Sequence, residues 1–140
     1  YPVITMQDTH YTHNGTKENL LGNKPSKDLK DYFSNELQVK EDTPPAILIH
    51  TNEDVGVPPE NSINYYLALR KFNIPSALHI WEGGTHGLGL ANNYDGSFKN
   101  WPNTVKNWMV ERGLLTEWYS NLISITKSIE IILNRILHMT

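Results

Sequence analysis

Short apolar runs separated by polar and amphipathic stretches divide the first part of the chain. The run at 46–50, Ala-Ile-Leu-Ile-His, is apolar without alternation, which predicts a strand buried on both faces. Residues 77–81 predict a second strand, and the short β-branched run at 2–6 predicts another. A helix over about 58–72 is expected between the first two strands, because proline is tolerated in a first helical turn and one apolar stripe follows it.

Three further helices are expected around these strands. One covers 14–21 and ends at Gly22, and one covers 27–33 with Ser26 as its N-cap. A third covers about 102–111. Strands that alternate with helices pair in parallel, so the fold class is α/β: a parallel sheet, with about three strands from this chain, flanked by helices.

The pattern changes in the segment 115–139. Its apolar residues recur at alternating spacings of four and three, which predicts an amphipathic helix. The seam consists of Trp118, Leu122, Ile125, Ile129, Ile132 and Ile136. This helix is too polar to span a membrane, and no membrane partner is expected. The pattern therefore predicts a domain over 1–114 and a helical extension over 115–140.

Composition and charge narrow the class of protein. The chain is 39% hydrophobic and 19% charged, which is ordinary for a globular domain of its 140 residues. A net charge of −3 and the lack of any Lys/Arg cluster argue against a nucleic-acid partner. The chain has no cysteine, which excludes disulfides and thiolate chemistry.

Two residues with candidate chemistry follow the two clearest strands. Asp54 lies in the loop after 46–50, and His86 lies in a glycine-rich turn after 77–81. They are 32 residues apart, the length of one loop, one helix and one strand. Because parallel strands end at the same edge of a sheet, the carboxylate is expected to meet the imidazole there. A carboxylate in that position fixes the histidine tautomer and stabilises an imidazolium.

These residues also carry a family resemblance. The stretch 44–50, with Asp-Val-Gly-Val-Pro at 54–58, resembles the acid-bearing loop of α/β-hydrolases. Gly-Thr-His-Gly-Leu-Gly-Leu at 84–90 resembles their histidine loop. The order of acid and then histidine agrees with Ser…Asp…His. The resemblance covers 1–114 and is strongest to the carbohydrate-esterase and dienelactone-hydrolase-like lipases, including acetylxylan and feruloyl esterases. The same motifs occur in prolyl-oligopeptidase-like peptidases.

The resemblance implies the C-terminal portion of a serine esterase, with Asp54 as the acid and His86 as the base. The adjacent Glu53 is the rival acid. No metal or organic cofactor is implied, and the substrate would be a small ester or an esterified carbohydrate, acetyl or feruloyl. The sequence contains no Gly-x-Ser-x-Gly, so the nucleophile is expected upstream of Tyr1, and this chain alone is expected to be inactive.

Two other functions remain open. The chain could be a non-enzymatic module that associates through 115–139, or part of a prolyl-oligopeptidase-like peptidase. An incomplete sheet exposes an edge strand and apolar faces, so we expect a homo-oligomer or strand exchange. The C-terminal helix could instead cover its own chain.

Other polar and aromatic residues have less specific patterns. Asp8, His10 and His13 could hold a metal, but their spacing is loose, and surface-loop residues are the simpler interpretation. His50 and His79 lie in predicted strands and are interpreted as structural.

Two tryptophans and one dipeptide complete the candidates. Trp81 and Trp101 could line a sugar-ester pocket, although core packing is the favoured interpretation. Asn61-Ser62 is expected in the first turn of the helix after the acid loop.

Overall fold

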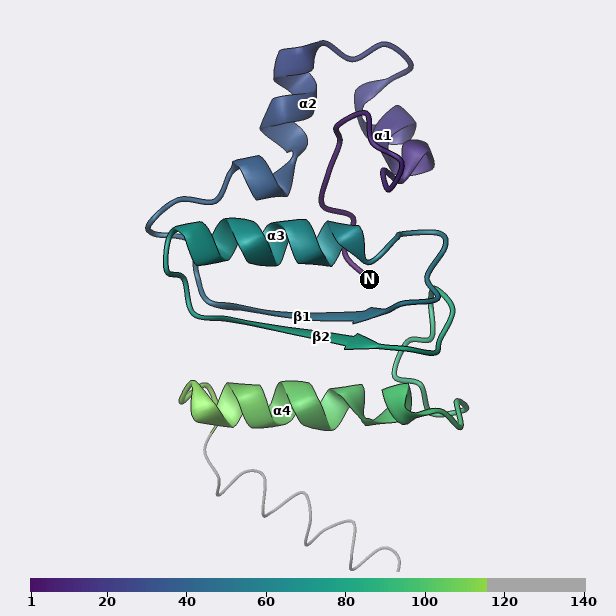
Figure 1. Ribbon diagram of the computed structural model, residues 1–140, viewed down its shortest axis with the longest axis vertical. Helices are drawn as coiled ribbons and strands as arrows, with labels where there is room; N and C mark the ends of the chain where they lie inside the picture. The colour runs from purple at the N-terminus through teal and green to yellow at the C-terminus, as the bar shows by residue number, and fades with distance from the viewer. Residues whose placement is uncertain (116–140) are drawn as a thin grey trace, which may run out of the picture. The chain divides into compact units, whose positions relative to one another are not determined.

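The computed structural model describes residues 1–115, which belong to two compact units (Figure 1). The first unit, Tyr1–Trp101, holds the sheet, and the second begins at Pro102. The helix α4 covers Trp101–Glu111. The amphipathic helix predicted over 115–139 lies outside the described residues except for its first position. Among residues 1–115, no helix is both long enough and apolar enough to cross a membrane.

Two parallel strands form the sheet. β1 (Ala46–Thr51) pairs with β2 (Ser76–Trp81) in register from the first residue of each strand to the last, so both strands end at the same edge. The helix that connects them, α3 (Glu60–Lys71), packs against both strands (Figure 1). The predicted strand–helix–strand order and the α/β class are thereby confirmed. The described residues contain two strands, one fewer than expected.

The core lies where α3 meets the start of the sheet. Its buried members are Val39, Ala68, Leu69 and Ile74, with Ala46 and Tyr65 packed against them. Within β1, Leu48 is buried, whereas Ile47 and Ile49 are only half-buried. The expectation that β1 is buried on both faces therefore holds only in part.

Asn73 ends α3 in a left-handed conformation with a φ of 55°. Its N–H donates to Arg70 O, and the N–H of Ile74 donates to Leu69 O, so two carbonyls of the last turn are satisfied. Pro75 follows and cannot continue the helix. The chain then enters β2 directly, which places the second strand beside the first.

The segment 2–6 is not a strand, and the prediction for it was wrong. The backbone N–H groups of Ile4 and Thr5 both donate to Asn61 Oδ1, at 3.0 and 3.2 Å. The N–H of Met6 donates to Ser34 Oγ at 2.9 Å. Buried side chains therefore satisfy these amides in place of a neighbouring strand.

The two short N-terminal helices lie where the sequence predicts them. α1 covers Asn14–Leu21 and ends at Gly22, which has a φ of 80°. α2 covers Lys27–Phe33, and the Ser26 Oγ accepts the N–H of Leu29 at its start. Two 3-10 turns complete the described chain: Asn35–Leu37 and Ser97–Asn100.

Candidate active site

Asp54 and His86 meet at the edge where both strands end. The loop after β1 is joined to the end of β2 by a hydrogen bond from Asn52 N–H to Trp81 O, at 2.7 Å. Beyond this bond, His86 Nδ1 lies 2.8 Å from Asp54 Oδ2. Asp54 is 2% exposed, whereas the side chain of His86 is half-exposed. The arrangement is a buried carboxylate that holds an accessible imidazole by one ring nitrogen.

A tight turn holds the other oxygen of Asp54. Oδ1 accepts the N–H of Gly56 at 3.0 Å and the N–H of Val57 at 2.8 Å. Burial is the largest influence on the pKa of Asp54 and acts to raise it. The hydrogen bonds from Val57 and His86 and the nearby histidine charges outweigh burial, and the net pKa lies below its usual value. Asp54 is therefore ionised at neutral pH and accepts hydrogen bonds on both oxygens.

The rival acid, Glu53, makes a different contact. Its Oε2 accepts the N–H of Gly84 at 2.9 Å, so it links the acid loop to the histidine loop. Gly84 has a φ of 128°, and a Cβ there would lie 2.9 Å from the Thr51 Cγ2. Only glycine fits that position without strain. The structure thus brings Asp54, rather than Glu53, to the ring of His86.

His50, which was expected to be structural, is fully buried beside the acid. Its Nε2 lies 2.7 Å from Val57 O and 3.5 Å from Asp54 Oδ2, and its Nδ1 lies 2.7 Å from Ser62 Oγ. Burial, the largest influence, lowers the pKa of His50. A neutral ring must donate from Nε2, because a carbonyl can only accept, and Nδ1 then accepts the Ser62 hydroxyl. The sequence placed Ser62 in the first helical turn but gave no sign of this contact.

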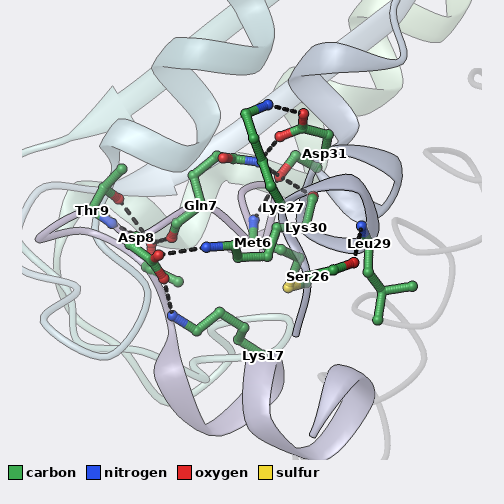
Figure 2. A network of polar contacts seen from close by, with 12 residues as sticks. Met6, Gln7, Asp8, Thr9, Lys17, Ser26, Lys27, Leu29, Lys30 and Asp31 are labelled. Atoms are coloured by element: carbon green, nitrogen blue, oxygen red, sulfur yellow. Dashed lines mark hydrogen bonds and ion pairs between the residues drawn. The ribbon is translucent and has the colours of Figure 1, made fainter. Parts of the chain in front are cut away.

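Asp8 takes part in ion pairs. Figure 2 shows its carboxylate between Lys17 of α1, at 2.9 Å, and Lys30 of α2, at 2.5 Å. These two contacts, led by the hydrogen bond from Lys30, lower the pKa of Asp8 to about 2. A second ion pair in the same view joins Lys27 to Asp31 within α2. Asp8 therefore ties the loop 7–13 to both short helices.

The other two residues of the possible metal site also serve local structure. His13 caps α1, since its Nδ1 accepts the N–H of Thr16 at 3.1 Å. His10 packs edge-on against the ring of Tyr11, with centroids 5.1 Å apart. Within residues 1–115, no three His, Asp or Glu side chains form a group that could hold a metal ion.

One of the two tryptophans lines a small hollow near the base. The hollow has a volume of about 210 Å³, and its walls are Tyr1, Ile49, Gly89, Phe98 and Trp101. The ring of Tyr1 lies 5.2 Å from that of His86, so the hollow adjoins the candidate base. Trp81 instead stacks on His79 and packs edge-on against Phe98, in agreement with core packing.

Comparison with known proteins places this pair of loops in a family. The sequence pattern of the prolyl oligopeptidase family matches residues 1–111, which include both loops and both strands. The chain belongs to this family. The match confirms the predicted resemblance to α/β-hydrolases, because the segment that matches is the one that carries the resembling motifs.

Two of three similar proteins have names that state an ester-hydrolase activity. The chain is 45% identical to endo-1,4-beta-xylanase B of Butyrivibrio fibrisolvens over 72% of this chain, and 39% identical to acetylxylan esterase of Xylanibacter ruminicola over 64%. An acetyl ester-xyloside bifunctional hydrolase from Caldicellulosiruptor lactoaceticus superposes with a TM-score of 0.78 at 38% identity, over 82% of this chain. The match spans 15% and 19% of the two sequence relatives and 41% of the solved structure.

Proposed function

We propose that Asp54 and His86 are the acid and base of a serine esterase that acts on acetyl or feruloyl esters of carbohydrates. The observation that supports this most directly is the 2.8 Å contact between His86 Nδ1 and Asp54 Oδ2. It occurs at the ends of adjacent parallel strands, in a segment related to acetylxylan esterase. A general base requires an accessible imidazole whose other ring nitrogen is hydrogen-bonded to a carboxylate, and His86 and Asp54 have this arrangement.

In the proposed reaction, a serine from outside these 140 residues attacks the ester carbonyl. His86 Nε2 takes the proton of the serine hydroxyl and then gives it to the leaving alcohol, which produces an acyl-enzyme. A water molecule then gives a proton to the same nitrogen and attacks the acyl carbonyl, and the carboxylic acid leaves as that nitrogen returns the proton to the serine oxygen. Asp54 holds the Nδ1–H of His86 throughout and stabilises the imidazolium formed in each step. The mechanism calls for no metal or organic cofactor.

The acetyl-ester part of the proposed substrate class rests on the relatives, and the feruloyl alternative rests on the resemblance of the acid and histidine loops alone. One relative is an acetylxylan esterase, and another is an acetyl ester-xyloside bifunctional hydrolase. A peptidase is the second candidate, because the family pattern that matches residues 1–111 is that of prolyl oligopeptidases. Self-association through the segment 115–139 stays a prediction.

A chimera tests the esterase proposal. In the Caldicellulosiruptor hydrolase, the segment that superposes on this chain is replaced by the residues of this chain that match it. We expect the chimera to hydrolyse p-nitrophenyl acetate and acetylated xylo-oligosaccharides, and His86→Ala to lower kcat by about 10⁶-fold, as for the base of a triad. The unfused chain should show no hydrolysis.

Two results would count against the proposal. A folded chimera whose ester hydrolysis is unaffected by His86→Ala would remove His86 from the reaction. Cleavage of a prolyl-peptide anilide in preference to the acetyl ester would favour the peptidase.

A further inference from the structure

We propose that His50 is a positioning residue for the acid, and that it acts by fixing the turn that presents Asp54 to His86. This inference rests on the proposed function, because it assigns a role to a third residue of the same site. The polar contacts of His50 are with Ser62, Val57 and Asp54, so its action on the base is through Asp54.

The contacts form a continuous path from α3 to the acid. The Ser62 hydroxyl meets His50 Nδ1 at 2.7 Å, and His50 Nε2 meets Val57 O at 2.7 Å. The N–H of the same Val57 donates to Asp54 Oδ1 at 2.8 Å. His50 and Ser62 are fully buried, and Val57 is 2% exposed, so water cannot replace either bond to the histidine.

The directions of these bonds require one tautomer. Val57 O can only accept, so His50 Nε2 must carry the proton, and Nδ1 is left to accept from Ser62. The same Nε2 lies 3.5 Å from Asp54 Oδ2, the oxygen that also contacts His86. A ring with its proton on Nδ1 would instead place a nitrogen lone pair against both a carbonyl and a carboxylate. Ser62 therefore helps to select the tautomer that holds the turn.

The consequence is that Val57 is held from both sides. The ring of His50 binds its carbonyl, and its N–H donates to Asp54 Oδ1. The two groups lie in adjacent peptide planes, so fixing the carbonyl limits the rotation of Val57 and helps to keep its N–H on Asp54. The hydrogen bond from Val57 is the largest influence that lowers the pKa of Asp54. If His50 is lost, the turn should loosen, the bond from Val57 should weaken, and the pKa of Asp54 should rise.

Two substitutions of His50 test whether the hydrogen-bond donor at Nε2, rather than the volume of the ring, is what matters. In His50→Gln the side-chain amide nitrogen extends about as far as Nε2 and can still donate to Val57 O. In His50→Asn the amide reaches only as far as Nδ1 and cannot. Carbon-13 NMR of the 140-residue chain would follow the Asp54 carboxyl during a pH titration. We expect Asn to raise the pKa of Asp54 by about one unit and Gln to leave it within a few tenths.

Ser34→Ala is the matched control, because Ser34 is also fully buried and its hydroxyl donates to Lys30 O and accepts the N–H of Met6, both outside the acid loop. It should lower stability without moving the pKa of Asp54. The proposal is overturned if Asn and Gln raise that pKa equally, if neither raises it, or if Ser34→Ala raises it as much as Asn does.

A second measurement needs no substituted chain, so it tests the proposal even if His50→Asn does not fold. Nitrogen-15 spectra of the unsubstituted chain should place the His50 proton on Nε2, and a proton on Nδ1 would overturn the proposal. The same spectra report on His86. Suppose that the His86 proton lies on Nδ1 but the pKa of Asp54 is unchanged by substitution of His50. That result would refute the positioning role alone and leave the proposed acid–base pair intact.

Discussion

Asn61 is predicted to be one of the most sensitive positions for stability outside the apolar core. Its side chain is fully buried at the start of α3, and its Oδ1 accepts the N–H groups of Ile4 and Thr5. Its Nδ2 donates to Tyr11 O at 2.8 Å and to Pro58 O at 3.1 Å. Asn61→Ala removes all four of these hydrogen bonds at once and leaves the segment 2–6 held by Met6 N–H to Ser34 Oγ and by Ile4 O, which accepts the N–H of Asn35.

The size of the stability loss on Asn61→Ala depends on which of the freed backbone groups water can reach. Ile4 and Thr5 are 5% and 1% exposed, so both amides stay unpaired after the substitution. Each unpaired buried amide costs about 1–3 kcal/mol. Alanine recovers about 0.6 kcal/mol through its better helix propensity. The carbonyl of Pro58 keeps the backbone N–H of residue 61 as its donor, and the carbonyl of Tyr11 belongs to a half-buried residue, so neither adds a large cost. The free energy of unfolding should therefore fall by about 1.5–5 kcal/mol.

Urea unfolding followed by circular dichroism measures the change, with Asn64→Ala as the control. Asn64 lies on the same helix and is half-buried, and no described residue is seen to hydrogen-bond its side chain. Asn61→Ala should lower the urea midpoint by about 1–2 M. Asn64→Ala should change stability by no more than about 0.5 kcal/mol. Equal effects of the two substitutions would refute the role assigned to the Asn61 side chain.

Three further predictions concern single residues. Gly84→Ala should destabilise more than Gly87→Ala by about 1–3 kcal/mol in urea unfolding, because both have positive φ but only Gly84 has side chains within contact of a new Cβ; equal losses would mean that the close approach does not matter. Lys30→Met should raise the pKa of Asp8 from about 2 toward its usual value of about 3.9, as carbon-13 NMR would show; no rise would remove the ion pair as its cause. Since the pKa of Asp54 is lowered by folding, its contribution to stability is complete above about pH 3.9 and is lost as the pH falls through the folded-state value. Asp54→Asn should therefore flatten the acid side of the stability–pH curve, and an unchanged slope would contradict the lowered pKa.

The elements whose local pattern is strong could be predicted from the sequence. β1 and β2 are apolar runs, and α3 lies between a proline pair and a proline stop, so each begins within a few residues of its predicted start. The segment 2–6 has the composition of a strand, but its conformation depends on Asn61, more than fifty residues away in the chain. No local pattern reports that contact.

The candidate site also contains contacts that could be predicted from the sequence and contacts that could not. The meeting of Asp54 and His86 could be anticipated, because parallel strands that pair in register end together. The contacts of Glu53 and His50 could not, because they depend on side-chain directions within tight loops. For Glu53, the sequence offered only adjacency to Asp54, and the structure shows a bond to the opposite loop.

The most direct test of the account compares Asp54→Asn with Glu53→Gln in the esterase chimera described above. Asparagine keeps the size of Asp54 but cannot stabilise the imidazolium, so kcat for acetyl ester hydrolysis should fall by about 10⁴-fold. Glutamine keeps an oxygen that can accept the N–H of Gly84, so Glu53→Gln should leave kcat within a few-fold. A chimera that retains kcat with Asp54→Asn, or that loses it with Glu53→Gln instead, would contradict the assignment of Asp54 as the acid that serves His86.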